Sequence, residues 1–302
     1  MSQFKITIPA SSANMGPGFD SAGLALNRFL TLDVKKQEEW SFEHRGHFLP
    51  AISNYKEHMI YQIAKQTAER HQMVLPAAHV TVKSEIPLAR GLGSSSSAVL
   101  AGIELANQLC DLTLTTERKL QYGTEIEGHP DNIAPALFGG VIVTTTTPSG
   151  GVEYVSLPKL DLDVVVYIPT VELKTEAARN VLPKHFSRKD ATTASSISNV
   201  MIASLLTRDY ELAGKMMESD GFHEPFRAEL IPNYEVIRQE ARKTGAYGTV
   251  ISGAGPTMIS FVPKGKATKI AAHMTAQLAD YEVVKLKIDQ NGLQVGVLPP
   301  PR

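Results

Sequence analysis

Apolar and polar residues alternate with two different periods along the first half of the chain, and each period predicts a different element. Residues 4–8, 29–34 and 79–83 alternate at every second position, which is typical of strands that bury one face. Residues 54–72 instead place apolar side chains three and four positions apart, which predicts a helix with one buried stripe. The first half therefore mixes strands and helices.

Local start signals predict two further helices. The run of glycines and serines after Pro87 leads into an apolar stretch, so we expect a helix at about residues 95–109. A second helix is expected over residues 115–127, because Thr115 can cap its start and Glu117 lies in its first turn.

The rest of the chain follows the same mixed pattern. The sequence Pro-Ser-Gly-Gly at residues 148–151 is the segment near the middle of the chain that most resembles a linker. We therefore expect an α+β fold in two domains, residues 1–150 and 151–302. The further predicted elements are strands at 141–147, 164–168 and 281–287, helices at 175–181, 192–217, 233–244 and 266–278, and a hairpin of 248–252 with 257–262.

Length and composition agree with two globular domains. The chain has 302 residues, and domains commonly hold about 150. It is 43% hydrophobic and 20% charged, which argues against a disordered, collagenous or coiled-coil chain. Thirty basic and 31 acidic residues leave a net charge of -1, so neither a nucleic acid nor a membrane is expected as a partner.

The single cysteine and the lack of long apolar runs exclude further classes of protein. Cys110 alone can form neither an intrachain disulfide nor a cysteine-based zinc cluster. The first 14 residues have no apolar core behind a basic start, and no stretch approaches the 18 apolar residues that span a bilayer. We therefore expect a cytoplasmic protein.

The segment PLARGLGSSSSA at residues 87–98 is the strongest candidate for chemistry. Glycines let a backbone approach a ligand closely, and the helix start behind them offers free N–H groups and a positive dipole end to an anion. The alternative is a plain strand-to-helix turn in which the serines only cap the helix. Neither G-x-x-x-x-G-K-[ST] nor G-x-G-x-x-G occurs, which excludes the P-loop and Rossmann types of phosphate loop.

Three segments together resemble the motifs of the GHMP kinases. They are PASSANMGPGFDSAG at residues 9–23, PLARGLGSSSSA at 87–98 and GTVISGAGPTMISF at 248–261, in the order and spacing of that family. The resemblance implies an N-terminal domain like ribosomal protein S5 domain 2, a C-terminal ferredoxin-like domain, and ATP and substrate in the cleft between them. It implies nucleotide contacts from Pro87, Leu88, Ala89, Arg90, Gly91, Leu92, Gly93, Ser94, Ser95, Ser96 and Ser97.

Other segments resemble the branch of this family that phosphorylates L-homoserine. The first motif lacks the Gly-Glu-His ending of the sugar-type members, and residues 127–140, 173–183 and 223–232 are similar to the homoserine branch. The implied reaction transfers the γ-phosphoryl group of ATP to the side-chain hydroxyl of L-homoserine, forming O-phospho-L-homoserine in threonine biosynthesis. A homodimer is common among such relatives. The alternatives are a family member acting on another small alcohol, such as a mevalonate-pathway intermediate, or a non-catalytic relative that senses a ligand.

A zwitterionic acceptor needs both charge signs in its site. Arg179 and Arg227 are candidates for its carboxylate, because a guanidinium can bind one with two hydrogen bonds. Asp20 is the candidate for its ammonium group, and Asn14 can add neutral hydrogen bonds. The alternative for either arginine is a solvated surface charge.

By the same resemblance, His129, Asp131 and Asn132 surround the hydroxyl and amino groups of the acceptor. Asp131 is either a base or only a substrate ligand, because phosphoryl transfer can proceed by positioning and charge stabilisation alone. Thr175, four residues before Arg179, shares its helix face and could seat the hydroxyl.

The third motif and the metal site complete the expected site. Gly253 and Gly255 belong to a glycine loop expected to close on substrate and phosphates. Mg²⁺ prefers oxygen ligands, and the resemblance assigns it to Ser95 and Glu125, with Glu127 as the alternative carboxylate.

Overall fold

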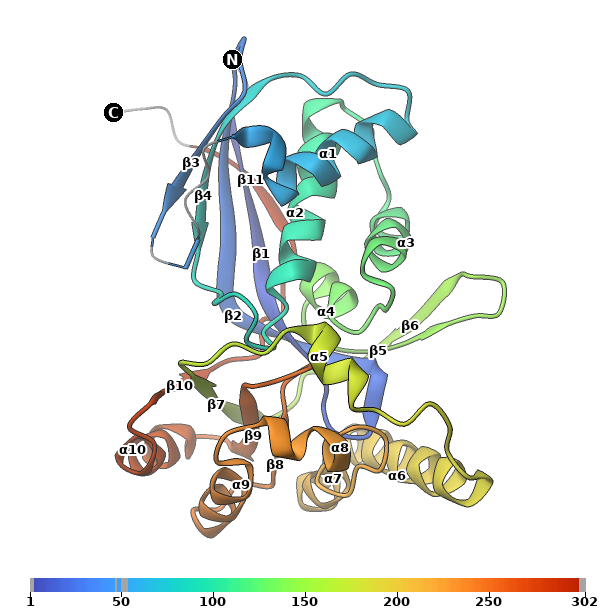
Figure 1. Ribbon diagram of the computed structural model, residues 1–302, viewed down its shortest axis with the longest axis vertical. Coiled ribbons are helices and arrows are strands. Elements are labelled where there is room, and N and C mark those ends of the chain that lie inside the picture. Colours follow the sequence, from blue (N-terminus) through green and yellow to red (C-terminus); the bar gives the residue numbers. More distant parts are fainter. Residues whose placement is uncertain (1–2, 47, 50–53, 299–302) are drawn as a thin grey trace.

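The computed structural model describes residues 3–46, 48–49 and 54–298, and two β-sheets lie one above the other along its long axis (Figure 1). The first sheet has the order β11-β1-β2-β4-β3, with β5 paired to β2 and β6 paired to β5. All of its pairs are antiparallel except β3 with β4. Its strands are β1 (Gln3–Asn14), β2 (Gly18–Lys36), β3 (Ser41–Arg45), β4 (Ala78–Ser84), β5 (Val141–Thr146), β6 (Val152–Ser156) and β11 (Gln294–Val297).

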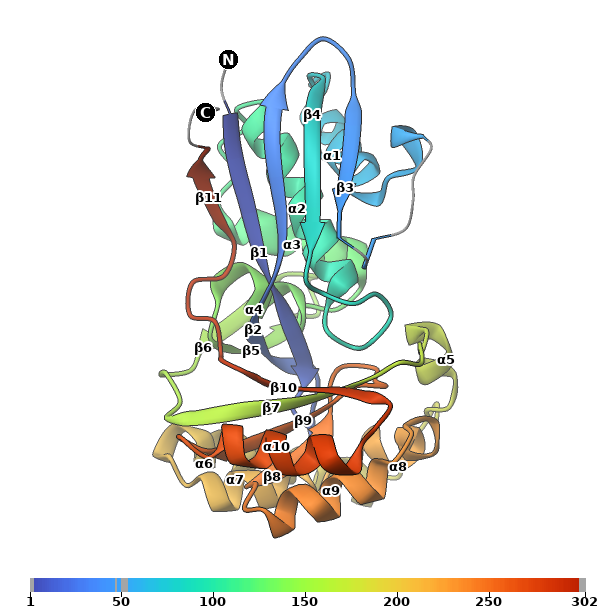
Figure 2. The same cartoon turned by 90° about the vertical axis from the view of Figure 1, so that its left-hand side faces the viewer.

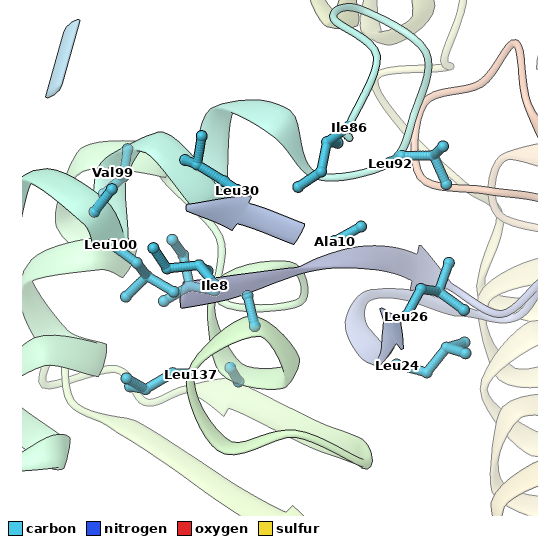
Figure 3. Close-up of a cluster of buried hydrophobic side chains, with 14 of the residues drawn as sticks. Ile8, Ala10, Leu24, Leu26, Leu30, Ile86, Leu92, Val99, Leu100 and Leu137 are labelled. Atoms are coloured by element: carbon cyan, nitrogen blue, oxygen red, sulfur yellow. The ribbon is translucent and has the colours of Figure 1, made fainter. Parts of the chain in front are cut away.

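Helices cover one face of this sheet (Figure 2). Apolar side chains from β1, β2 and the central helix α2 interlock there, among them Ile8, Leu30 and Leu100 (Figure 3). Burying this surface is the main term that stabilises the unit. The helices are η1 (Tyr55–Glu57), α1 (Met59–Arg70), α2 (Ser94–Leu109), α3 (Thr116–Glu127) and α4 (Ile133–Phe138).

The second sheet is antiparallel, with the order β10-β7-β9-β8. Strand, helices, hairpin, helix and strand follow one another in the ferredoxin-like arrangement, which confirms that expectation. In the described part of the chain, no helix is both long and apolar enough to cross a membrane. The elements are β7 (Leu162–Pro169), α5 (Thr175–Asn180), α6 (Arg188–Thr207), α7 (Tyr210–Met217), α8 (Glu224–Arg227), η2 (Ala228–Leu230), α9 (Tyr234–Lys243), β8 (Gly248–Ile251), β9 (Met258–Pro263), α10 (Ala267–Gln277) and β10 (Tyr281–Leu286).

The single helix predicted at 192–217 is wrong, because the structure has two helices there. Arg208 adopts the left-handed conformation, with φ of 62°, and ends α6. Asp209 then caps α7 by accepting a hydrogen bond from the Leu212 amide. The chain turns between the two helices, so that both pack in the layer below the second sheet (Figure 1).

The Pro-Ser-Gly-Gly segment at 148–151 is the turn between β5 and β6, not a linker. A division at 150/151 would therefore cut a hairpin of the first sheet. The C-terminal strand β11 also returns to that sheet and pairs with β1. We propose that the first unit takes in β6 and β11 as well as residues up to 146.

Candidate active site

The three motifs meet where the two sheets adjoin. The Ser252 hydroxyl donates a hydrogen bond to the Gly91 carbonyl oxygen at 2.6 Å, which joins the third motif to the second. The Gly253 amide donates to the Ala13 carbonyl oxygen at 3.1 Å, and the Asn14 side chain donates back to the Gly253 carbonyl oxygen at 2.8 Å. Segments about 240 residues apart in sequence thus form one wall of the site.

Two positions in the phosphate-type loop require glycine. Gly93 has φ of 68°, and a Cβ there would lie 2.1 Å from the Ser11 hydroxyl oxygen. A Cβ at Gly91 would lie 2.2 Å from the Ser252 carbonyl oxygen. Because Gly93 occupies the N-cap of α2 without a side-chain cap, the first amides of that helix are open to an anion.

A cavity opens beside this helix start. Its lining includes residues of the loop before α2 and of the short helix α5, two segments that lie close together in Figure 1. The structure brings most of the predicted residues to its lining: Asn14, Asp20, Ala89, Arg90, Gly91, Gly93, Ser94, Ser95, Ser96, His129, Asp131, Asn132, Thr175, Arg179, Arg227 and Gly253.

Several predicted residues lie outside this lining. Leu92 is buried in the hydrophobic core, and the Ser97 hydroxyl donates to the Pro9 and Gly93 carbonyl oxygens. Gly255 lies against the core side chain of Ile231, where a Cβ would approach to 2.4 Å. These three positions shape the loops, and Pro87 and Leu88 line neighbouring hollows instead.

The Arg90 guanidinium is held by groups of the second unit, although the residue belongs to the cavity lining. It donates to the carbonyl oxygens of Pro169 at 3.0 Å and Thr170 at 2.6 Å, and it pairs with Glu172. The guanidinium therefore ties the loop to the second unit.

The predicted metal carboxylate, Glu125, does not reach the start of α2. Its carboxylate accepts hydrogen bonds from Arg70 at 2.6 Å and from Gln121 at 3.1 Å, and these bonds lower its pKa. The alternative, Glu127, accepts a hydrogen bond from the Ser95 hydroxyl at 2.5 Å and one from the Ser96 hydroxyl at 2.9 Å. The structure therefore brings Glu127, and not Glu125, to the start of α2.

An acidic cluster of Asp20, His129 and Asp131 also lines this cavity. Ligand atoms of Asp20, His129 and Asp131 all lie within 4.8 Å of one another. His129 Nδ1 is hydrogen-bonded to a carboxylate oxygen of Asp131, which is almost fully buried. Burial alone would lower the pKa of His129, but the hydrogen bond and charge of Asp131 outweigh it and raise the pKa. Asn132 lies at the N-cap of α4, where its Oδ1 accepts from the Ser11 hydroxyl.

Both predicted arginines reach this acidic group. Arg179 donates two hydrogen bonds to the Asp20 carboxylate, at 2.9 and 3.3 Å. Arg227 is buried, and it donates from Nε to the Ala178 carbonyl oxygen and from Nη1 to the Gly253 carbonyl oxygen. Burial lowers the pKa of Arg227 to about 10, so the guanidinium remains charged at neutral pH. The cavity thus carries fixed charges of both signs.

Sequence reasoning missed an apolar cavity beside the first one. It shares Ala89, Ser94 and Ser95 with the first cavity. Its apolar residues come from separate elements and carry no joint sequence signal, so only the folded chain reveals it. They include Leu30, Leu49, Ile60, Val82, Ile86, Leu88 and Ala98, with His44 and His58 beside them.

The fold and this site define a two-domain small-molecule kinase. The family profile named GHMP kinases N terminal domain matches residues 58–140, and the profile named GHMP kinases C terminal matches residues 201–280. The chain belongs to the GHMP kinase family.

The similar relatives include homoserine kinases. That of Oceanobacillus iheyensis is 52% identical over 297 residues, covering 98% of this chain and 99% of the relative. That of Halalkalibacterium halodurans is 47% identical and covers 97% of this chain and 94% of the relative. The crystal structure of homoserine kinase from Cytophaga hutchinsonii has a TM-score of 0.86 at 26% identity, covering 98% of each chain. L. major mevalonate kinase, at 16% identity and a TM-score of 0.73, shares the fold.

Proposed function

We propose that this protein is a homoserine kinase, which transfers the γ-phosphoryl group of ATP to the side-chain hydroxyl of L-homoserine. The observation that carries the proposal is the placement of Asp20, Arg179 and Arg227 in one cavity beside the open start of α2. An amino-acid acceptor and a phosphate donor would then meet in a single space. The similarity to homoserine kinases over nearly the whole chain supports the same substrate.

The acceptor would exchange with an ion pair that the protein already makes. Arg179 and Asp20 form an ion pair with one another. A zwitterion offers a carboxylate to the arginine and an ammonium group to the aspartate, so both side chains stay paired when it binds. An acceptor without the ammonium group, such as mevalonate, would leave Asp20 without that cation. The exchange therefore favours amino acids over other small alcohols.

ATP would occupy the two adjoining cavities. The apolar cavity suits a nucleoside, because its lining is largely aliphatic and it opens directly onto the loop before α2. The phosphates would then reach the open amides at Ser94 and Ser95, where the helix dipole favours negative charge. The transferred group would point at the acidic cluster.

The oxygen donors beside the phosphate position fit a magnesium ion. Ser95 offers a hydroxyl and Glu127 a carboxylate, which are the ligand types that Mg²⁺ prefers. When bound, the ion neutralises negative charge on the phosphates. We propose Ser95 and Glu127 as its protein ligands, in place of Ser95 and Glu125.

The remaining residues would orient the acceptor hydroxyl. The Asp131 carboxylate would accept a hydrogen bond from the hydroxyl, and His129 and Thr175 line the same cavity. Positioning and charge stabilisation alone can support phosphoryl transfer, so the proposed function does not require Asp131 to take the proton. A homodimer and a cytoplasmic location stay predictions of the sequence.

The direct test of the proposed function is ADP release with a panel of small alcohols. The purified protein with ATP and Mg²⁺ should release ADP when L-homoserine is added, and not when mevalonate is added. Turnover of mevalonate without homoserine would support the other-alcohol alternative. A folded protein that binds ATP and homoserine without turnover would support the sensor alternative.

A further inference from the structure

His223 is the one histidine of the described chain that is fully buried and bonded to a site arginine. It lies at the start of α8, one helical turn before Arg227. Its ring stacks on Phe19 with the centroids 5.2 Å apart, and the Arg227 guanidinium lies 5.3 Å from the centre of the same Phe19 ring. The imidazole and the guanidinium therefore share the Phe19 ring as a neighbour and contact one another.

The two partners of the imidazole determine which nitrogen carries its proton. His223 Nε2 lies 3.0 Å from the Gly16 carbonyl oxygen, which can only accept, so Nε2 must donate. His223 Nδ1 lies 3.2 Å from Arg227 Nη1, which can only donate, so Nδ1 must accept. Both bonds are satisfied together only by a neutral ring with its hydrogen on Nε2.

The surroundings agree with a neutral ring. Complete burial lowers the pKa of His223 to about 4, and the adjacent positive charge of Arg227 acts in the same direction. The carboxylate of Asp220, 3.7 Å from Nε2, opposes this shift but also accepts hydrogen bonds from the backbone amides of His223 and Glu224. At neutral pH the ring therefore keeps its Nδ1 lone pair for the arginine.

This acceptor completes the set of contacts that fixes the guanidinium. Arg227 uses Nε for the Ala178 carbonyl oxygen and Nη1 for both Gly253 and His223. No described residue accepts a hydrogen bond from Nη2. Because a guanidinium is planar, fixing Nε and Nη1 also fixes the direction of Nη2. That nitrogen is then the one left for a ligand in the cavity that Arg227 lines.

We propose that His223 is a positioning residue for acceptor recognition: its neutral Nδ1 holds the Arg227 guanidinium in the orientation that receives the acceptor carboxylate. The proposal rests on the proposed homoserine kinase function. It gives His223 a role in acceptor affinity without contact to either substrate. It also gives the β1–β2 turn a role, because the Gly16 carbonyl oxygen sets the ring by accepting from Nε2.

Two amide variants distinguish the roles of the two ring nitrogens of His223. In His223→Asn, the amide oxygen occupies about the position of Nδ1 and can still accept from Arg227. In His223→Gln, the amide nitrogen occupies about the position of Nε2, so the bond to Gly16 is kept and the acceptor for Arg227 is lost. His223→Leu removes both. Ser260→Ala is the control, because it removes buried hydrogen bonds to Tyr167 and Thr249 in the second sheet.

The readout is steady-state kinetics with homoserine and with its neutral amide. We expect His223→Gln and His223→Leu to raise the KM for homoserine about tenfold, equivalent to about 1.4 kcal/mol, and to weaken the preference over the amide. The KM for ATP should change by less than about twofold, a difference well below 1 kcal/mol. His223→Asn and Ser260→Ala should keep the homoserine KM within about threefold of wild type.

The comparison decides the proposal even where one variant fails to fold. If His223→Leu is unfolded, the contrast between Asn and Gln remains. Equal homoserine KM values for the Asn and Gln variants, or a loss that falls equally on ATP, would overturn the positioning role. A wild-type protein that does not turn over homoserine would instead remove the proposed function, a result seen before any variant is made.

Discussion

Glu125 and Glu127 lie two positions apart at the end of α3 and meet opposite surroundings. At 3.6 residues per turn, they point about 200° apart around the helix axis. Glu125 therefore faces Arg70 on α1, whereas Glu127 faces the serines that begin α2. Two similar side chains thus have different chemistry because of helix geometry alone.

The two glutamates form a matched pair for a magnesium experiment. Glu127→Gln should lower kcat by at least about tenfold, or raise the Mg²⁺ concentration needed for half-maximal rate by a similar factor, because the amide removes the charge that would hold the cation. Glu125→Gln should stay near wild type, because an exposed ion pair contributes about 1 kcal/mol or less. The measurement is initial rate against Mg²⁺ concentration at fixed ATP, and the reverse order of effects would restore Glu125 as the ligand.

Arg179 tests the acceptor half of the site. Its partly exposed side chain pairs with Asp20 and bonds to no backbone group of the described residues, so truncation disturbs the fold less than truncation of the buried Arg227. Arg179→Ala should lower kcat/KM for homoserine at least roughly 30-fold, the equivalent of about 2 kcal/mol. Calorimetry without homoserine should show unchanged ATP affinity. Lost ATP binding with intact homoserine turnover would assign the side chain to the nucleotide.

At this scale the sequence was informative wherever charge or motif identified a side chain. The need of a zwitterion for both signs selected Asp20, Arg179 and Arg227, and the structure brings them to one cavity. The orientation of a side chain was not predictable. Arg90 lies in the phosphate motif yet turns its charge toward Thr170, because carbonyl oxygens of the second unit lie within its reach.

At the scale of elements, the edge strand β8 depends on two carboxylates. The Thr249 amide donates to Glu218 and the Ile251 amide donates to Glu224, so side chains satisfy these two backbone amides of the strand. An unpaired edge is a site for unwanted strand pairing. Glu224 is buried, and its other oxygen accepts from the Tyr234 hydroxyl at 2.6 Å.

The buried Glu224 gives stability a defined dependence on pH. Burial raises its pKa from 4.5 to about 7, against the lowering effect of the hydrogen bonds from Tyr234 and Ile251. The folded state therefore binds this proton more tightly than the unfolded state. Its contribution to stability is fully present below pH 4.5 and is lost as pH rises through about 7.

Urea unfolding of wild type and Glu224→Gln across this range tests that contribution. The neutral amide keeps the acceptor for Ile251 and cannot ionise. Relative to Glu224→Gln, the free energy of unfolding of wild type should fall by roughly 3 kcal/mol between about pH 4.5 and about pH 8. A difference that does not change with pH would mean that Glu224 ionises in the folded protein as easily as in the unfolded chain.

Residue pattern and capping signals predicted most elements, but not all of their bounds and not every strand. Helix α3 begins beside its cap Thr115, as its polar face and capping signal indicate. In contrast, only residues 4–8 of β1 were predicted, because its residues 9–14 are all buried and lose the period of two. The strands β6 and β11 were missed because their partners are the only reason for their extended form.

At the scale of the molecule, the cavity depends on how the two units are held against one another. Hydrogen bonds from Ser252 to Gly91 and from Gly253 to Ala13 join them directly across the site. The family resemblance of the three motifs implies that ATP and acceptor lie between two domains. The prediction of a linker at 148–151 was wrong, because a sequence of proline and glycine is typical both of a hairpin turn and of a connection between domains.

The central claim is that this cavity reads the charges of an amino-acid acceptor and phosphorylates its hydroxyl. The most direct measurement is the ratio of kcat/KM for L-homoserine to that for its neutral carboxamide, in wild type and in Arg179→Ala, with ATP and Mg²⁺. The account predicts a wild-type preference of at least roughly 30-fold for homoserine, the equivalent of about 2 kcal/mol, and a much smaller preference in the variant. Equal turnover of the two acceptors by wild type, or the same ratio in both proteins, would contradict it.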